Sequence, residues 1–115
     1  MKVINKATVQ AETQDETNKL INQLIREIKI QMFLNHPNLI KLYSFFSDQY
    51  KIYLLMELAP DGQLYEYMRE SYKFTEESTS FLMRQTLLGI TFMHENHVIH
   101  RDLKPENIVV VHVKI

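Results

Sequence analysis

The stretch HENHVIHRDLKPENIVV, residues 94–110, decides how this chain of 115 residues is interpreted. Histidine recurs at every third position from residue 94 to residue 100, and Asp102, Lys104 and Asn107 follow at short offsets. A metal site, a catalytic loop and a polar turn are all compatible with such a group of residues. The spacing of the fixed positions and the sequence on either side distinguish among them.

A zinc site built from His94, His97 and His100 requires one continuous helix, because only there do residues three apart share a face. The helix that precedes the stretch is expected to end near Asn96, so the next turn would separate the three side chains. No acidic residue or cysteine stands at a typical ligand offset. The metal site is therefore the weaker interpretation.

The fixed positions match a catalytic loop better. His100-Arg101-Asp102-Leu103, then three arbitrary positions and Asn107, has the spacing H-R-D-L-x-x-x-N of the protein-kinase catalytic loop. The residue types suit that chemistry: Asp102 would orient an acceptor hydroxyl and take its proton, Lys104 would offset the developing phosphoryl charge, and Asn107 would supply an oxygen to magnesium. The alternative is a surface turn that matches the motif by chance, and it would require an accidental match at every fixed position.

The composition narrows the class of protein. The chain is 45% hydrophobic and 23% charged, and its formal net charge is −1, so nucleic acid and anionic membranes are not expected as partners. The absence of cysteine excludes disulfides and thiol catalysis. No apolar run is long enough to cross a membrane, and the first residues lack the apolar region of a signal peptide. These features predict an intracellular, cytoplasmic protein.

The hydrophobic pattern predicts an α+β order of elements. Strands are expected over 1–4, 39–46, 50–58 and 107–115, and helices over 17–34, 63–72 and 76–96. Pro37 stops the first long helix, and Thr75 is expected to cap the second. The helix over 76–96 has a broad apolar face that the rest of the chain covers poorly, so we expect further helices or a protein partner there.

The whole chain resembles the middle part of a eukaryotic protein kinase domain. The segment HRDLKPEN resembles the Ser/Thr class, and the segments at 26–46, 52–68 and 92–109 are most similar to the Aurora and polo-like branch. The resemblance implies a truncated α+β protein-kinase-like fold. Residues 1–58 would form part of the N-lobe without its glycine-rich loop, and residues 59–115 would form the hinge and the C-lobe portion before D-F-G.

The resemblance also implies residues that bind the phosphates of ATP. The segment MKVI resembles the V-A-I-K strand, so Lys2 would hold the α- and β-phosphates. Glu27, in REIKIQ, would be its ion-pair partner, and this pair must form for activity in the family. The alternatives are that Lys2 is an exposed terminal residue and Glu27 a solvated helix charge. Asn107 would bind Mg²⁺.

The adenine site is implied in the same way. LLMELAPDG, residues 54–62, resembles the hinge, where Met56 would be the gatekeeper and main-chain groups of Glu57 and Ala59 would bind the adenine edge. A buried strand followed by a turn is compatible with the same sequence. Val109 would form the floor of the adenine pocket. Positions that match the kinase regulatory spine are Gln31, Leu42 and His100.

The chain departs from a complete kinase domain. With only two glycines it cannot contain a glycine-rich loop, and it contains no D-F-G, activation loop or A-P-E. One hypothesis is part of a Ser/Thr kinase that transfers the γ-phosphate of ATP to protein substrates; the other is a non-catalytic binding module. The 115 residues alone are expected to have little activity, because phosphoryl transfer depends on positioning. Spindle or centrosome association follows only by analogy.

Overall fold

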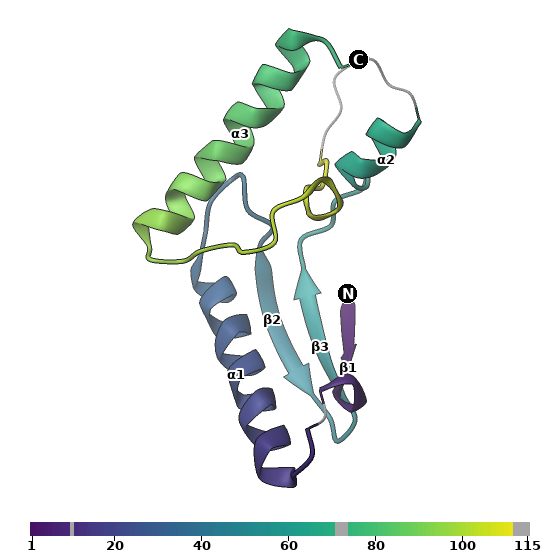
Figure 1. The fold of residues 1–115 in the computed structure, drawn as a ribbon, viewed down its shortest axis with the longest axis vertical. Coiled ribbons are helices and arrows are strands. Elements are labelled where there is room, and N and C mark those ends of the chain that lie inside the picture. The colour runs from purple at the N-terminus through teal and green to yellow at the C-terminus, as the bar shows by residue number, and fades with distance from the viewer. Residues whose placement is uncertain (10, 71–73, 112–115) are drawn as a thin grey trace. The chain divides into compact units, whose positions relative to one another are not determined.

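The computed structural model describes residues 1–9, 11–70 and 74–111 (Figure 1). The chain divides into two compact units. The first unit contains Met1–Asn35 and Leu39–Glu57, and the second contains His36–Asn38 and the residues from Leu58 onward. The first unit is a sheet with one long helix, and the second consists of helices and the loop that contains Asp102.

The first unit is built on a three-stranded antiparallel sheet with the order β1-β3-β2. Tyr53 in the central strand lies opposite Val3 on one side and Phe46 on the other. The register shifts between Leu42 and Ser44, and the second strand begins later than its sequence predicts. The strands are β1 (Lys2–Asn5), β2 (Leu42–Ser47) and β3 (Lys51–Met56).

Helix α1 (Gln14–Phe33) packs its apolar stripe on one face of this sheet (Figure 1). Ile28 from the helix meets Leu42, Ile52 and Leu54 from the strands, and the side chains of Leu42 and Ile52 have no exposed surface. Burying a side chain of this size stabilises a fold by about 1.5–3 kcal/mol. This cluster is the core of the first unit.

Helix α1 begins at Gln14, three residues before Thr17, where its apolar stripe starts. Thr13 caps it: the Thr13 hydroxyl accepts a hydrogen bond of 3.1 Å from the Glu16 N–H. Asp15 and Glu16 also place negative charge in the first turn, where the helix dipole favours it. The capped, polar first turn therefore extends the helix on the N-terminal side of its apolar stripe.

Asp48 organises the turn between β2 and β3. Its Oδ1 accepts hydrogen bonds from the N–H groups of Lys51 (2.6 Å) and Tyr50 (2.8 Å), and its Oδ2 accepts one from the Tyr53 hydroxyl (3.0 Å). The bond from Lys51, followed by that from Tyr50, lowers the pKa of Asp48. The bond to Asp48 raises the pKa of Tyr53. The short 3₁₀ helix η1 (Lys6–Thr8) adjoins this turn, because the Lys6 N–H donates to the Tyr50 carbonyl.

The second unit contains α2 (Leu64–Arg69) and α3 (Glu76–Glu95). Thr75 caps α3 as expected, with its hydroxyl accepting a hydrogen bond of 3.1 Å from the Ser78 N–H. Two residues after α3 ends, His97 has a φ of 62° in the left-handed region, and the Val98 N–H donates to the Met93 carbonyl. Among the described residues, no helix is both long and apolar enough to cross a membrane.

The strand predicted over 107–115 is wrong for its described part. Pro105 instead begins the 3₁₀ helix η2 (Pro105–Asn107), and Val109 then forms a single antiparallel bridge with Gln63. The bridge is short because the partner segment turns at Gly62 and enters α2 at Leu64. Residues 112–115 of that prediction, and 71–72 of the predicted helix over 63–72, lie outside the described residues.

Candidate functional site

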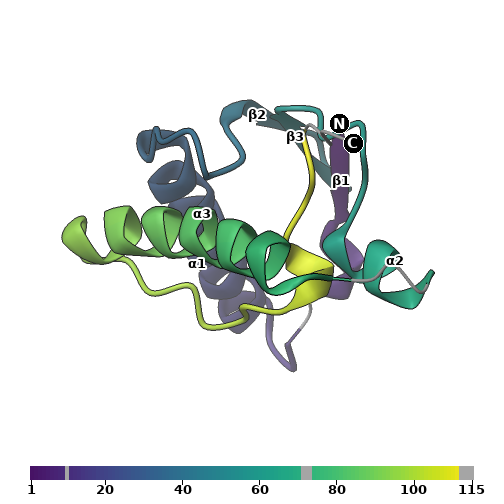
Figure 2. The same cartoon turned by 90° about the horizontal axis from the view of Figure 1, so that it is seen from above.

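Backbone hydrogen bonds hold both ends of the loop that carries Asp102. At its start, the Val98 N–H donates to Met93 at the end of α3 (2.9 Å). At its end, the Ile108 carbonyl accepts from the Leu64 N–H (2.8 Å) and the Val110 N–H donates to the Gly62 carbonyl (2.7 Å). Helix η2 therefore lies beside α2, as Figure 2 shows. Backbone hydrogen bonds therefore attach the first part of the loop to the end of α3 and its last part to the start of α2.

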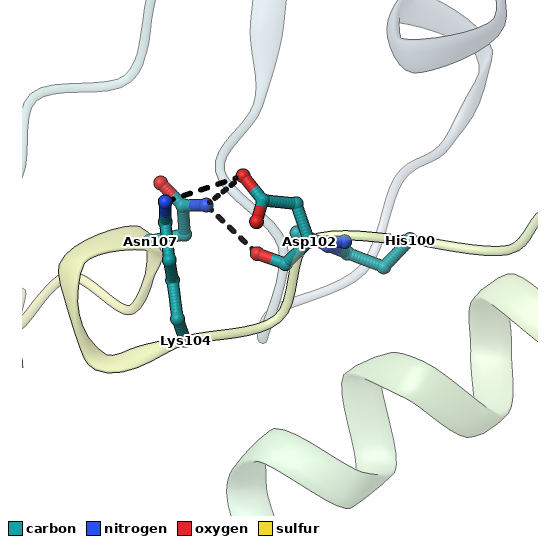
Figure 3. Close-up of polar contacts among 4 residues, drawn as sticks. All are labelled: His100, Asp102, Lys104 and Asn107. Atoms are coloured by element: carbon teal, nitrogen blue, oxygen red, sulfur yellow. Dashed lines mark hydrogen bonds and ion pairs between the residues drawn. The ribbon is translucent and has the colours of Figure 1, made fainter.

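Asp102, Lys104 and Asn107 meet within this loop (Figure 3). The Asn107 Nδ2 donates to both the Asp102 carbonyl (2.8 Å) and its Oδ2 (3.1 Å). The Lys104 Nζ lies 3.6 Å from the same Oδ2. The side chains of Asp102 and Lys104 are 68% and 47% exposed, so hydrogen bonds rather than burial position the carboxylate.

The backbone before Asp102 has an unusual conformation. Arg101 has a φ of 74°, which costs a residue with a side chain about 1–2 kcal/mol. The His100 Nδ1 accepts a hydrogen bond of 3.1 Å from the Asp102 N–H and thereby closes a ring around Arg101. Figure 3 shows His100 and Asn107 on opposite sides of Asp102. Such strain is characteristic of functional sites.

Two oxygen atoms of this constellation have no hydrogen-bond partner within the part of the chain that the structure describes. They are the Oδ1 of Asp102 and the Oδ1 of Asn107, because the contacts above use only Oδ2 and Nδ2. A free carboxylate oxygen can orient a hydroxyl and accept its proton. A free amide oxygen is a ligand that a hard divalent cation accepts, so Asn107 fits the role of a metal ligand.

Comparison with known proteins agrees with this geometry. The family model of the protein kinase domain matches residues 1–115. The chain belongs to the protein kinase family. Its α+β sheet and helices are therefore part of a kinase domain, and the family implies ATP and a divalent metal ion as cofactors.

The relatives of this kinase chain include several Aurora kinases. Aurora kinase B of Mus musculus is 44% identical over 97 residues, which are 84% of this chain and 28% of the relative. Aurora/IPL1-related protein kinase 2 of Caenorhabditis elegans is 46% identical over 89 residues (77% and 29%). Aurora kinase of Schizosaccharomyces pombe is 44% identical over 92 residues (80% and 26%). The chain thus spans less than a third of the length of these relatives.

The structure does not bring Lys2 and Glu27 of this kinase chain into an ion pair. Lys2 lies opposite Leu54, which is buried in the core beneath α1, so the register places Lys2 on the helix side of the sheet. Glu27 is exposed, and it lines an open groove with Arg26 and Ile30 on the outer surface of α1. Within the described residues the only ion pair is that of Lys104 with Asp102. The Lys2–Glu27 pair stays a prediction.

The main-chain groups of the hinge segment differ in their availability. Met56 ends β3 and packs against the core cluster. The Glu57 N–H donates to the Lys41 carbonyl (2.8 Å), and the Ala59 carbonyl accepts from the Gly62 N–H (3.3 Å). Among the described residues, the Glu57 carbonyl and the Ala59 N–H have no such partner. These are one acceptor and one donor that a ligand can use.

Val109 is half-buried, and its bridge to Gln63 connects the end of the Asp102 loop to the start of α2. The turn at Gly62 was expected from the sequence, but the pairing of Val109 with Gln63 was not. The signal for the turn is present in Ala59-Pro60-Asp61-Gly62, because proline and glycine occupy favoured positions of a β-turn. The partner of such a turn is a long-range property, and no local pattern indicates it.

The histidines at 94, 97 and 100 do not form a metal site. In the described part of the chain, no group of three or more histidine, cysteine or acidic side chains is placed to hold a metal ion. His94 lies in the last turn of α3, His97 has left-handed backbone, and the His100 Nδ1 accepts the bond from Asp102. Because α3 ends at Glu95, only His94 lies in the helix, and the three histidines do not share a helix face. The zinc alternative is therefore not supported.

The hydrogen bond from Asp102 to His100 is a feature that sequence reasoning missed. A second contact of this kind exists elsewhere in the chain, where the His36 Nδ1 accepts a hydrogen bond of 3.0 Å from the Asn38 N–H. In both places, a histidine accepts from the N–H two residues later. The spacing alone does not predict the contact, because His94-Glu95-Asn96 has the same spacing and the Asn96 N–H donates to the Phe92 and Met93 carbonyls instead.

Proposed function

We propose that the protein of which this chain is part is a Ser/Thr protein kinase, which transfers the γ-phosphate of ATP to serine and threonine hydroxyls of proteins. The observation that carries this proposal is the convergence of Asn107 and Lys104 on the carboxylate of Asp102. It is the arrangement that phosphoryl transfer requires, in which positioning and charge stabilisation supply most of the catalysis. Similarity to Aurora kinases supports the same reaction.

Each residue of the loop has a separate role in this proposal. Asp102 accepts a hydrogen bond from the substrate hydroxyl through its free Oδ1 and takes the proton as the oxygen attacks. Lys104 offsets negative charge on the transferring phosphoryl group, and its present contact with Asp102 keeps it within reach. Asn107 uses its Nδ2 to hold Asp102 and its Oδ1 to bind Mg²⁺. When bound, the metal ion neutralises phosphate charge.

The resemblance to the kinase family assigns roles in ATP binding to further residues. Lys2 would bind the α- and β-phosphates once it pairs with Glu27. The Glu57 carbonyl and the Ala59 N–H would hydrogen-bond the adenine edge, and neither group has a hydrogen-bond partner among the described residues. Met56 as the gatekeeper and Val109 as the floor would contact the adenine ring.

The experiment that tests the proposal measures transfer of labelled phosphate from ATP to a Ser/Thr peptide library by the full-length protein. Asp102→Asn is expected to lower kcat by about 100-fold or more, because it removes the general base without changing the size of the side chain. Asp15→Asn, the same chemical change in the exposed first turn of α1, is the matched control and should retain activity. An Asp102→Asn protein that works at the parent rate contradicts the proposal.

A second candidate function is that of a non-catalytic binding module. The observation that favours it is the apolar surface of α3, where Phe81, Leu87 and Leu88 are all exposed. We propose that a protein partner would then cover this surface, inside the cell and in the cytoplasm. Under this alternative, Leu88→Glu abolishes a complex that Asp102→Asn leaves intact. A protein without a partner but with peptide kinase activity excludes it.

A further inference from the structure

The end of helix α1 obtains its positive charge from outside the helix. The last carbonyls of a helix have no partner within it and carry partial negative charge, yet the last turn of α1 contains no basic residue. The Leu34 N–H donates to the Gln31 carbonyl. The Lys41 Nζ, nine positions further along the chain, donates to the Met32 carbonyl at 2.9 Å. Lys41 therefore supplies the cation that favours this helix end.

The main chain of Lys41 contacts the proposed hinge. Its carbonyl accepts a hydrogen bond of 2.8 Å from the Glu57 N–H. This bond extends the pairing of β2 with β3 by one position beyond Leu42 and Met56. It restrains the main chain of Glu57, whose carbonyl is the proposed acceptor for the adenine edge. One half-buried residue thus contacts both the last turn of α1 and the first residue of the hinge.

We propose that Lys41 is a positioning residue that couples the hinge to α1, so that a ligand held by the Glu57 carbonyl stabilises the last turn of the helix. Because coupling between two sites is reciprocal, an ordered end of α1 also favours binding at the hinge. The same helix carries Glu27, the proposed partner of Lys2. The coupling rests on the proposed function, in which Glu57 binds adenine.

Two substitutions test the side-chain contact and leave the main-chain carbonyl of Lys41 in place. Lys41→Met removes the cationic donor and keeps an unbranched side chain, whereas Lys41→Arg keeps a cationic donor. In the full-length protein, amide hydrogen exchange over residues 30–34 is expected to be about tenfold faster in Lys41→Met, because local opening there no longer breaks this hydrogen bond. Lys41→Arg should restore most of the protection. Lys19→Met, at an exposed position of α1, is the matched control and should exchange at the parent rate.

Adenosine tests the coupling itself, because it contains the adenine edge but no phosphate and so cannot act through Lys2. In the parent and in Lys41→Arg, saturating adenosine should slow exchange over residues 30–34 by about fivefold or more. In Lys41→Met this effect should disappear although adenosine still binds. An adenosine effect that persists in Lys41→Met would overturn the proposal, since the coupling would then follow another route, such as the packing of Met56 on the core. Equal exchange of the Met and Arg variants without adenosine would overturn it as well.

Calorimetry and kinase assays distinguish failure of this proposal from failure of the proposed function. Adenosine that binds the parent protein without slowing exchange over residues 30–34 refutes the coupling and leaves the proposed function intact. Adenosine that does not bind the parent refutes the proposed adenine contact of Glu57 together with the coupling. The expected exchange pattern in a protein that transfers no phosphate would uphold the role of Lys41 and refute the proposed reaction.

Discussion

Replacing Gly62 with alanine is expected to destabilise the second unit by about 1–2 kcal/mol. Gly62 closes the turn that begins at Ala59, and its φ of 79° lies in the region where a side chain meets the neighbouring carbonyl. An added Cβ would lie 3.1 Å from the Glu66 Oε2, which is the end of a flexible side chain and can move. The backbone conformation should therefore account for most of the loss.

The substitution should also disturb the proposed ATP site, because the Gly62 carbonyl accepts a hydrogen bond from the N–H of Val110, which is next to Val109. We expect a higher KM for ATP in Gly62→Ala. Urea titration measures the free energy of unfolding, with Gly62→Asn as the matched control, since asparagine tolerates positive φ better. Adding Glu66→Ala to Gly62→Ala should recover little stability. Full recovery, or an unchanged free energy of unfolding in Gly62→Ala, would refute the argument from backbone conformation.

Two further predictions concern stability. His97→Gly is expected to stabilise the protein by about 0.5–1 kcal/mol in the same titration, because it relieves the φ of 62° at the end of α3; a loss would contradict this. Asp48 has a lowered pKa in the folded protein, so its contribution is present above the ordinary aspartate pKa and is lost as pH falls through the lower folded value. Unfolding titrations below about pH 4 should show this loss, and an Asp48→Asn protein with the same pH dependence would exclude it.

The elements that the sequence predicted well are those with local signals. The Thr75 cap and the apolar spacing after it predicted α3, and the two aromatic runs predicted β2 and β3. Helix α1 begins before its apolar stripe because its first turn is polar and depends on the Thr13 cap. The predicted C-terminal strand was wrong for its described part, because a strand depends on its partner and the segment at Gln63 offers only a single bridge there.

The same distinction explains which parts of the candidate site could be predicted. The contacts of Asp102 with His100, Lys104 and Asn107 all lie within eight consecutive residues, so a local motif encodes them. The Lys2–Glu27 pair depends instead on how α1 packs on the sheet and on which way Glu27 points, and the structure places Glu27 in an exposed groove. The contacts of the proposed catalytic loop are therefore present among the described residues, whereas the proposed Lys2–Glu27 ion pair is not.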